Sequence, residues 1–235
     1  MRANQVSHWI IALVAFAILP AGAEWQSVGP GIALQTLRWQ GATVIAIRAT
    51  MAQCDVRVVH GKSEASAQIV CPPVGVAINA SFFQEDHTPI GLLVVGGREL
   101  QPPLRSDSWG VFYLQQDYPH IALASERLPH GITQAFQARP RLIVQGKVLT
   151  FKVQPPTARS AVGIDAGGHL LLAVVQGGLT LAQWANCLHD ALSCTDALNL
   201  DGGPSTQLAV RGKATIDIHG GWKVPVLLTI ASKPR

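Results

Sequence analysis

One short segment, residues 199–206, constrains the fold of this chain most strongly. It reads Asn-Leu-Asp-Gly-Gly-Pro-Ser-Thr and lies between an apolar run and a strand-like run. Gly202 and Gly203 allow positive φ angles and a close approach of the backbone to a ligand. Pro204 stiffens the exit, so we expect Asp201 to be held in place. A plain hairpin turn is the alternative, because Asp-Gly is a common turn signal. The variety of polar groups favours a binding loop.

A second polar cluster also follows an apolar run. Residues 74–78 are small and apolar, as in a fully buried strand, and Asn79 comes directly after them. Asn79 and Glu85 are suitable hydrogen-bond partners for sugar hydroxyls. Phe82 and Phe83 either pack on a sugar face or fill the core, and core packing is the better expectation for at least one ring. The chain thus has two polar clusters, each after a buried strand.

The rest of the chain is punctuated by turns, which predicts many strands. The sequence has 22 Gly and 15 Pro, and both residues favour turns. Strands are expected at residues 32–37, 43–47, 56–60, 74–78, 92–95, 99–100, 108–114, 121–124, 140–144, 159–164, 170–175 and 224–230. Turn signals predict that 92–95 and 99–100 form one hairpin and that 159–164 and 170–175 form another. The clearest helix starts from a capping box with Thr180 as N-cap, and its apolar face is Leu181, Trp184, Leu188 and Leu192. We predict one α+β domain, rich in β, with a mixed sheet and few helices.

The N-terminus has the layout of a cleavable secretory signal peptide. Arg2 precedes an apolar run at residues 9–19, and small residues follow up to Ala23. Cleavage after Ala23 leaves a mature chain of residues 24–235 with no membrane span. A membrane anchor is the alternative, although the apolar run is short for a bilayer. We predict a protein that is periplasmic or secreted.

Four cysteines fit an oxidising compartment: Cys54, Cys71, Cys187 and Cys194. Three pairings are possible, and sequence order favours disulfides between Cys54 and Cys71 and between Cys187 and Cys194. No closely spaced cysteine or histidine cluster indicates a metal site, and no cofactor is predicted. The net charge of +4 is too small and too scattered to indicate nucleic acid binding.

Four motifs give the chain a resemblance to the phosphodiester glycosidase family. They are Asn79-Ala-Ser-Phe-Phe, Pro89-Ile-Gly-Leu, Arg159-Ser-Ala-Val-Gly and Ala197-Leu-Asn-Leu-Asp-Gly-Gly-Pro-Ser, in the order of the family. The resemblance covers roughly residues 74–230. The family is named for an enzyme that removes N-acetylglucosamine from a sugar phosphodiester, and many bacterial members are exported and exopolysaccharide-related. Those members often have Asn-Ala-Gly or Asn-Gly-Gly where this chain has Asn-Ala-Ser, and Ser-Gly-Pro where it has Ala138-Arg139-Pro140.

Residue chemistry and the resemblance together assign candidate roles. Glycosyl transfer to water needs a carboxylate near the anomeric carbon, where positive charge develops, and Asp201 is the candidate. Arg159 is predicted to grip the phosphate, with Arg139 as a further cation. Glu85 is the candidate accessory acid or water-orienting base. The predicted substrate-binding residues are Asn79, Gly202, Gly203, Ser205, Thr206 and Arg139.

We expect Asn79, Glu85, Arg159 and Asp201 to meet in one pocket. The strands before Asn79 and Asp201 would open into a common crevice if they were neighbours with the same orientation in one sheet. Two candidate functions fit these residues. The first is an exported hydrolase of a sugar-1-phosphodiester, or a related glycosidic bond, in envelope or extracellular glycans. The second is a non-catalytic glycan-binding or envelope-assembly protein, which the cation at Arg139 favours. A structural β protein explains the strands but not the two polar clusters.

Overall fold

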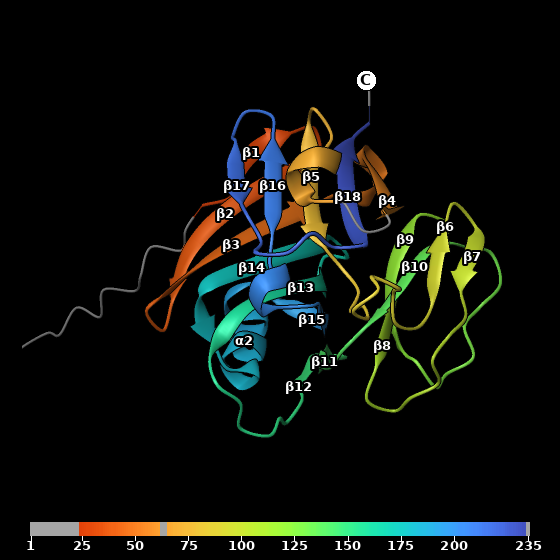
Figure 1. Ribbon diagram of the computed structural model, residues 1–235. Helices are drawn as coiled ribbons and strands as arrows, with labels where there is room; N and C mark the ends of the chain where they lie inside the picture. Colours follow the sequence, from red (N-terminus) through yellow and green to blue (C-terminus); the bar gives the residue numbers. More distant parts are fainter. Residues whose placement is uncertain (1–23, 62–64, 234–235) are drawn as a thin grey trace, which may run out of the picture.

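The computed structural model describes residues 24–61 and 65–233 (Figure 1). The predicted signal peptide, residues 1–23, lies outside the described residues. The strands of the described part form three sheets, and every strand pairing within them is antiparallel. No helix among these residues is long and apolar enough to cross a membrane.

The three sheets divide the strands as follows. The large sheet has the order β1-β2-β3-β14-β13-β15-β11-β12. Its strands are β1 (Gln26–Gly29), β2 (Ile32–Trp39), β3 (Ala42–Ala49), β11 (Arg141–Val144), β12 (Lys147–Val148), β13 (Thr157–Asp165), β14 (Leu170–Leu179) and β15 (Cys194–Asn199). The β10 sheet joins β7 (Arg98–Gln101), β6 (Leu93–Val95), β10 (Ile132–Ala138), β8 (Gly110–Gln115) and β9 (Tyr118–Leu123). The β5 sheet joins β17 (Ile216–Ile218), β16 (Leu208–Arg211), β5 (Gly75–Asn79), β18 (Val226–Ser232) and β4 (Cys54–His60).

The predicted fold class is wrong, because the fold is predominantly β and all three sheets of the described residues are antiparallel, not mixed. The common crevice expected at Asn79 and Asp201 required the strands before them to be neighbours with the same orientation in one sheet. Instead β5 and β15 belong to different sheets. The hairpins that the sequence indicated locally, β6–β7 and β13–β14, are confirmed.

The main core lies where the three sheets face one another. Alternation along β5 shows how the sequence builds it, since Val76 and Ile78 join this core whereas Ala77 faces the opposite side. The β10 sheet contributes Phe112 and Phe136, whose ring centroids are 5.2 Å apart. Burial of these apolar side chains fixes how the sheets stack.

Short helices cover the outer faces of the large sheet and the β5 sheet. The predicted capping box is confirmed: the Thr180 hydroxyl accepts from Gln183 N–H, and the Gln183 side chain accepts from Thr180 N–H. It starts α2 (Leu181–Asn186), which continues as the π-helix η2 (Cys187–Ala191). Trp184 of α2 is fully buried in a second core on the large sheet. The remaining helices are η1 (Met51–Gln53), α1 (Ala67–Val70) and η3 (Gly203–Ser205).

The predicted disulfides are wrong, since all four cysteines are free. Cys54 belongs to the main core, whereas Cys71 packs on the opposite face of the β5 sheet, so the sheet separates their sulfur atoms. Cys187 and Cys194 both lie in the core beneath α2, where Cys194 Sγ sits against Gly163 of β13. Burial raises the pKa of the Cys187 thiol to about 12. These cysteines therefore act as small apolar side chains.

Candidate functional site

Asn79 and Asp201 meet although their strands lie in different sheets. The Asn79 Nδ2 donates to the backbone oxygen of Asp201 at 2.7 Å, and Asp201 N–H donates to Ala80 O at 3.2 Å. The Asn79 Oδ1 accepts from Ser160 Oγ at 2.7 Å and from Gln207 N–H at 3.1 Å. Asn79 is fully buried. It therefore supports the Asp201 loop from behind by joining β5, β13 and the start of β16.

The loop after Asp201 requires its glycines. A Cβ on Gly202 would lie 2.8 Å from the Ala158 carbonyl oxygen, and Gly203 has a φ of 57°. Gly202 N–H donates to Asp201 Oδ1 at 3.0 Å, which fixes the carboxyl above the turn. Pro204 lies near the start of the short helix η3, in which the chain turns away from the loop. The segment is thus an ordered loop that holds the Asp201 carboxyl group in one position, as we expect from its glycines and proline.

Burial changes the acidity of Asp201. Loss of hydration raises the pKa of this carboxyl above its ordinary value, and the Ser205 hydroxyl and the Gly202 amide partly counter the rise. A carboxylate that water solvates poorly interacts strongly with a positive charge that develops beside it. Asp201 is therefore suited to stabilise such a charge.

The Asp201 carboxyl opens into a pocket of about 530 Å³, which we call the Asp201 pocket. Its lining comes from the loop after β5, the segment before β8, the β10–β11 connection, the segment after β12, the strand β13, the start of α2, and the end of β15 with the loop that follows it. The lining residues are Phe82, Ser108, Arg139, Pro140, Thr150, Phe151, Lys152, Gln154, Thr157, Arg159, Leu181, Asn199, Asp201, Gly202 and Gly203. Asp201 is the one acidic residue among them, against three cations.

Two arginines reach this pocket in different ways. Arg159 is buried, and its Nε donates to Leu179 O at 2.6 Å. Burial lowers the pKa of Arg159, but a guanidinium group stays protonated in proteins. The Arg139 guanidinium is exposed and lies over two aromatic rings, 5.1 Å from the centroid of Trp109 and 5.8 Å from that of Phe82. Neither arginine forms a salt bridge within the described residues, so both charges are available to a ligand.

The predicted site residues fall into three groups. Asp201, Arg159, Arg139, Gly202 and Gly203 line the pocket. Asn79, Ser205 and Thr206 are buried and do not line it. Glu85 lines a separate hollow.

Six polar residues of the pocket were not predicted as site residues from the sequence: Ser108, Thr150, Lys152, Gln154, Thr157 and Asn199. Asn199 Nδ2 donates to Arg139 O at 2.9 Å and so holds the segment that carries that arginine. Asn199 belonged to the polar segment around Asp201, which was a usable signal. Lys152 comes from a loop without any motif, so no sequence signal pointed to it.

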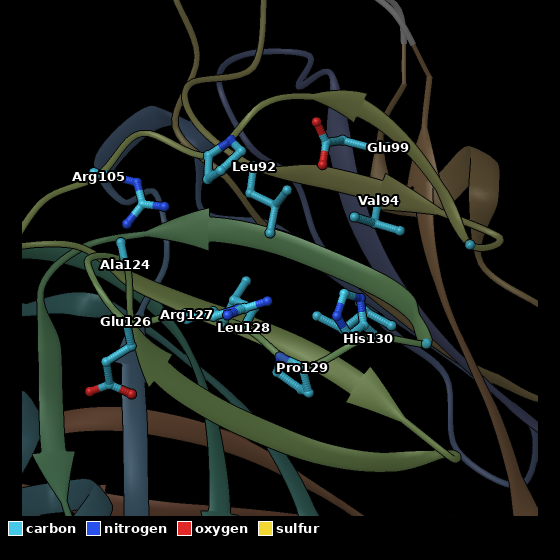
Figure 2. A pocket seen from close by; sticks show the side chains of 14 residues that line it. Leu92, Val94, Glu99, Arg105, Ala124, Glu126, Arg127, Leu128, Pro129 and His130 are labelled. Carbon is cyan, nitrogen blue, oxygen red and sulfur yellow. The ribbon is translucent and has the colours of Figure 1, made fainter.

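Another hollow, of about 330 Å³, lies on the β10 sheet (Figure 2). Arg105, Arg127 and His130 surround the apolar Leu92 and Val94 there. It shares no lining residue with the Asp201 pocket. Its acidic residues, Glu99 and Glu126, are exposed.

No group of three or more His, Cys, Asp or Glu in the described part of the chain is arranged to hold a metal.

Comparisons with known proteins agree with this geometry. The family model for phosphodiester glycosidase matches residues 73–231. No curated protein matches the chain.

Solved structures resemble the fold at low sequence identity. The catalytic domain of zebrafish N-acetylglucosamine-1-phosphodiester alpha-N-acetylglucosaminidase, auto-inhibited by its pro-peptide, has a TM-score of 0.65 at 18% identity, over 91% of this chain and 87% of that one. A hypothetical protein from Synechocystis has a TM-score of 0.57 at 18% identity, over 86% and 62% of the two chains. A presumed exported protein from Burkholderia pseudomallei has a TM-score of 0.56 at 11% identity, over 81% and 74%.

Proposed function

Because this chain belongs to the phosphodiester glycosidase family, we propose that the Asp201 pocket hydrolyses a sugar-1-phosphodiester at its glycosidic bond. One observation carries the proposal: the pocket combines a single carboxyl group with Arg139, Arg159 and Lys152. Ordinary glycosidases use two carboxyl groups, one of them to protonate the leaving oxygen. A phosphate leaving group does not need that proton. It needs positive charge, which these side chains supply.

The reaction breaks the bond between the anomeric carbon and the phosphate oxygen. Asp201 stabilises the positive charge that develops on the sugar ring, and the bond electrons leave with the phosphate. Arg159 and Arg139 neutralise that phosphate, and the glycine backbone leaves room for it. Water adds its oxygen to the anomeric carbon and releases a proton. The products are a free sugar and a phosphate monoester.

The exported location belongs to the same proposal. The layout of residues 1–23 supports a cleaved signal peptide, and one structural neighbour is a presumed exported protein. A glycan of the cell envelope or the extracellular medium is the substrate that this location favours. The zebrafish relative is named for N-acetylglucosamine linked to phosphate, which supports testing that sugar first.

Removal of either arginine should discriminate between charged and neutral substrates. We expect Arg159→Ala and Arg139→Ala to lower kcat/KM for UDP-N-acetylglucosamine by about thirtyfold or more, the effect of losing roughly 2 kcal/mol of charged hydrogen bonding. Hydrolysis of a neutral nitrophenyl N-acetylglucosaminide should change much less. The measurement is steady-state kinetics on both substrates.

Arg98→Ala is the matched control, because Arg98 lies on β7 outside the pocket and the change removes the same charge. Equal losses on both substrates would contradict the assignment of the arginines to phosphate. Binding of UDP-N-acetylglucosamine by the wild-type protein without any turnover would instead favour the non-catalytic glycan-binding function.

A further inference from the structure

A hollow of about 570 Å³, which shares no lining residue with the Asp201 pocket, has the chemistry of a sugar-binding surface. We call it the Trp222 hollow, and it is lined by Phe83, Gln84, Glu85, His87, Gly221, Trp222 and Lys223. Trp222 is 58% exposed, which is unusual for so large an apolar side chain. The rings of Phe83 and His87 stack with centroids 5.3 Å apart and only 9° between their planes. Aromatic surface gathered in a hollow in this way is suited to bind the apolar face of a ligand.

The two loops that carry these rings are held by their backbones. In the first loop Gln84 N–H donates to Thr88 O and His87 N–H donates to Gln84 O, each at 2.9 Å. In the second loop Gly221 N–H and Trp222 N–H donate to Pro204 O at 2.7 and 3.2 Å. The rings thus stand on fixed supports, so little order has to be gained when a ligand binds.

The polar groups of the hollow select a neutral ligand. Glu85 and Lys223 carry opposite charges, and neither forms a salt bridge with another described residue. Their charges cancel, in contrast to the excess of cations in the Asp201 pocket. Pyranose rings combine an apolar face of C–H groups with a rim of hydroxyls. The flat aromatic rings match the face, and Glu85, Gln84 and Lys223 match the rim.

Two short segments of the chain connect the lining of the Trp222 hollow with that of the Asp201 pocket. Phe82 lines the pocket, and the next residue, Phe83, lines the hollow. Gly203 lines the pocket, and the next residue, Pro204, holds the backbone of Trp222. Residues next to each other in the chain therefore contribute to both surfaces.

We propose that the Trp222 hollow is a second carbohydrate subsite, which binds a neutral pyranose unit of an extended glycan. If the proposed function holds, the phosphodiester of that glycan lies in the Asp201 pocket, so the substrate is an oligosaccharide or polysaccharide and not a single sugar phosphate. Glu85 then binds substrate hydroxyls.

The test measures binding and does not depend on turnover. The probe is the tetramer of N-acetylglucosamine, titrated calorimetrically into the wild-type protein, Trp222→Ala and Asp201→Asn. We expect Trp222→Ala to weaken binding about tenfold or more, since loss of a stacking aromatic anchor has effects of this size. Asp201→Asn should bind the tetramer as the wild type does, because Asn keeps the size of the side chain and the neutral tetramer has no phosphodiester to place at residue 201.

Tyr118→Ala is the matched control, because Tyr118 is an aromatic side chain with 65% exposure that lines neither the Trp222 hollow nor the Asp201 pocket. Unchanged binding in this variant supports the proposal, and weakening equal to that of Trp222→Ala overturns it. The proposal is also overturned if the wild type does not bind the tetramer, if Trp222→Ala binds it equally well, or if Asp201→Asn abolishes binding. If the wild-type protein does not hydrolyse UDP-N-acetylglucosamine, that result counts against the proposed function. The binding results with the tetramer still test the subsite by themselves.

Discussion

Replacement of Asp201 by Asn should lower kcat for a sugar-1-phosphodiester by a hundredfold or more. Asn keeps the size of the side chain, and its amide oxygen can still accept from Gly202 N–H. It removes the negative charge that stabilises the oxocarbenium-like transition state. Loss of one such interaction costs about 3–4 kcal/mol of barrier. The measurement is the release of sugar from UDP-N-acetylglucosamine under saturating conditions.

Folding stability provides the control for this variant. Burial raises the pKa of Asp201 above the value it has in the unfolded chain, so the folded protein holds this proton more tightly. The contribution to stability is full below the unfolded pKa and is lost as the pH rises through the raised folded pKa. Asn cannot ionise, so thermal unfolding should show the variant at least as stable as the wild type at neutral pH. A folded Asp201→Asn protein with wild-type kcat would contradict the catalytic assignment.

Asn79→Ala should destabilise the fold by about 3 kcal/mol or more. The change leaves the Asp201 carbonyl oxygen, the Ser160 hydroxyl and Gln207 N–H without their side-chain partner. Each buried polar group that loses its partner costs about 1–3 kcal/mol. Denaturant unfolding should show a lower midpoint with an unchanged m value.

Thr229→Val is the matched control in the same sheet. Thr229 is also a buried polar residue, but its hydroxyl makes one hydrogen bond, to Arg57 O at 3.2 Å. We expect this change to cost roughly 1 kcal/mol. If Asn79→Ala costs no more than Thr229→Val, Asn79 does not hold the two sheets together.

Features encoded by neighbouring residues were predictable from the sequence. The capping box at Thr180 and the hairpin β13–β14 depend on contacts a few residues apart, and both are confirmed. The loop at Asp201 was recognisable because its glycines, proline and polar groups are adjacent in the chain. Local chemistry therefore located the central element of the site.

The pairing of distant strands, and the side of a sheet on which a side chain lies, were not predictable from the sequence in the same way. Nothing in residues 75–79 indicates that β5 pairs with β16 and β18 rather than with β15. Glu85 lies only six residues after Asn79, yet the turn between them directs it into the Trp222 hollow. Cys54 and Cys71 are separated by one short excursion of the chain, yet their side chains lie on opposite faces of one sheet. The packing of whole sheets determines these strand pairings and side-chain positions.

The central claim is that the Asp201 pocket binds a sugar-1-phosphodiester with its scissile bond at Asp201. The most direct measurement is a crystal structure of Asp201→Asn with intact UDP-N-acetylglucosamine. We predict the anomeric carbon beside residue 201 and the sugar-linked phosphate within hydrogen-bond distance of the Arg159 guanidinium. A sugar phosphate held instead by Arg105 and Arg127 in the hollow of the β10 sheet (Figure 2) would contradict the claim.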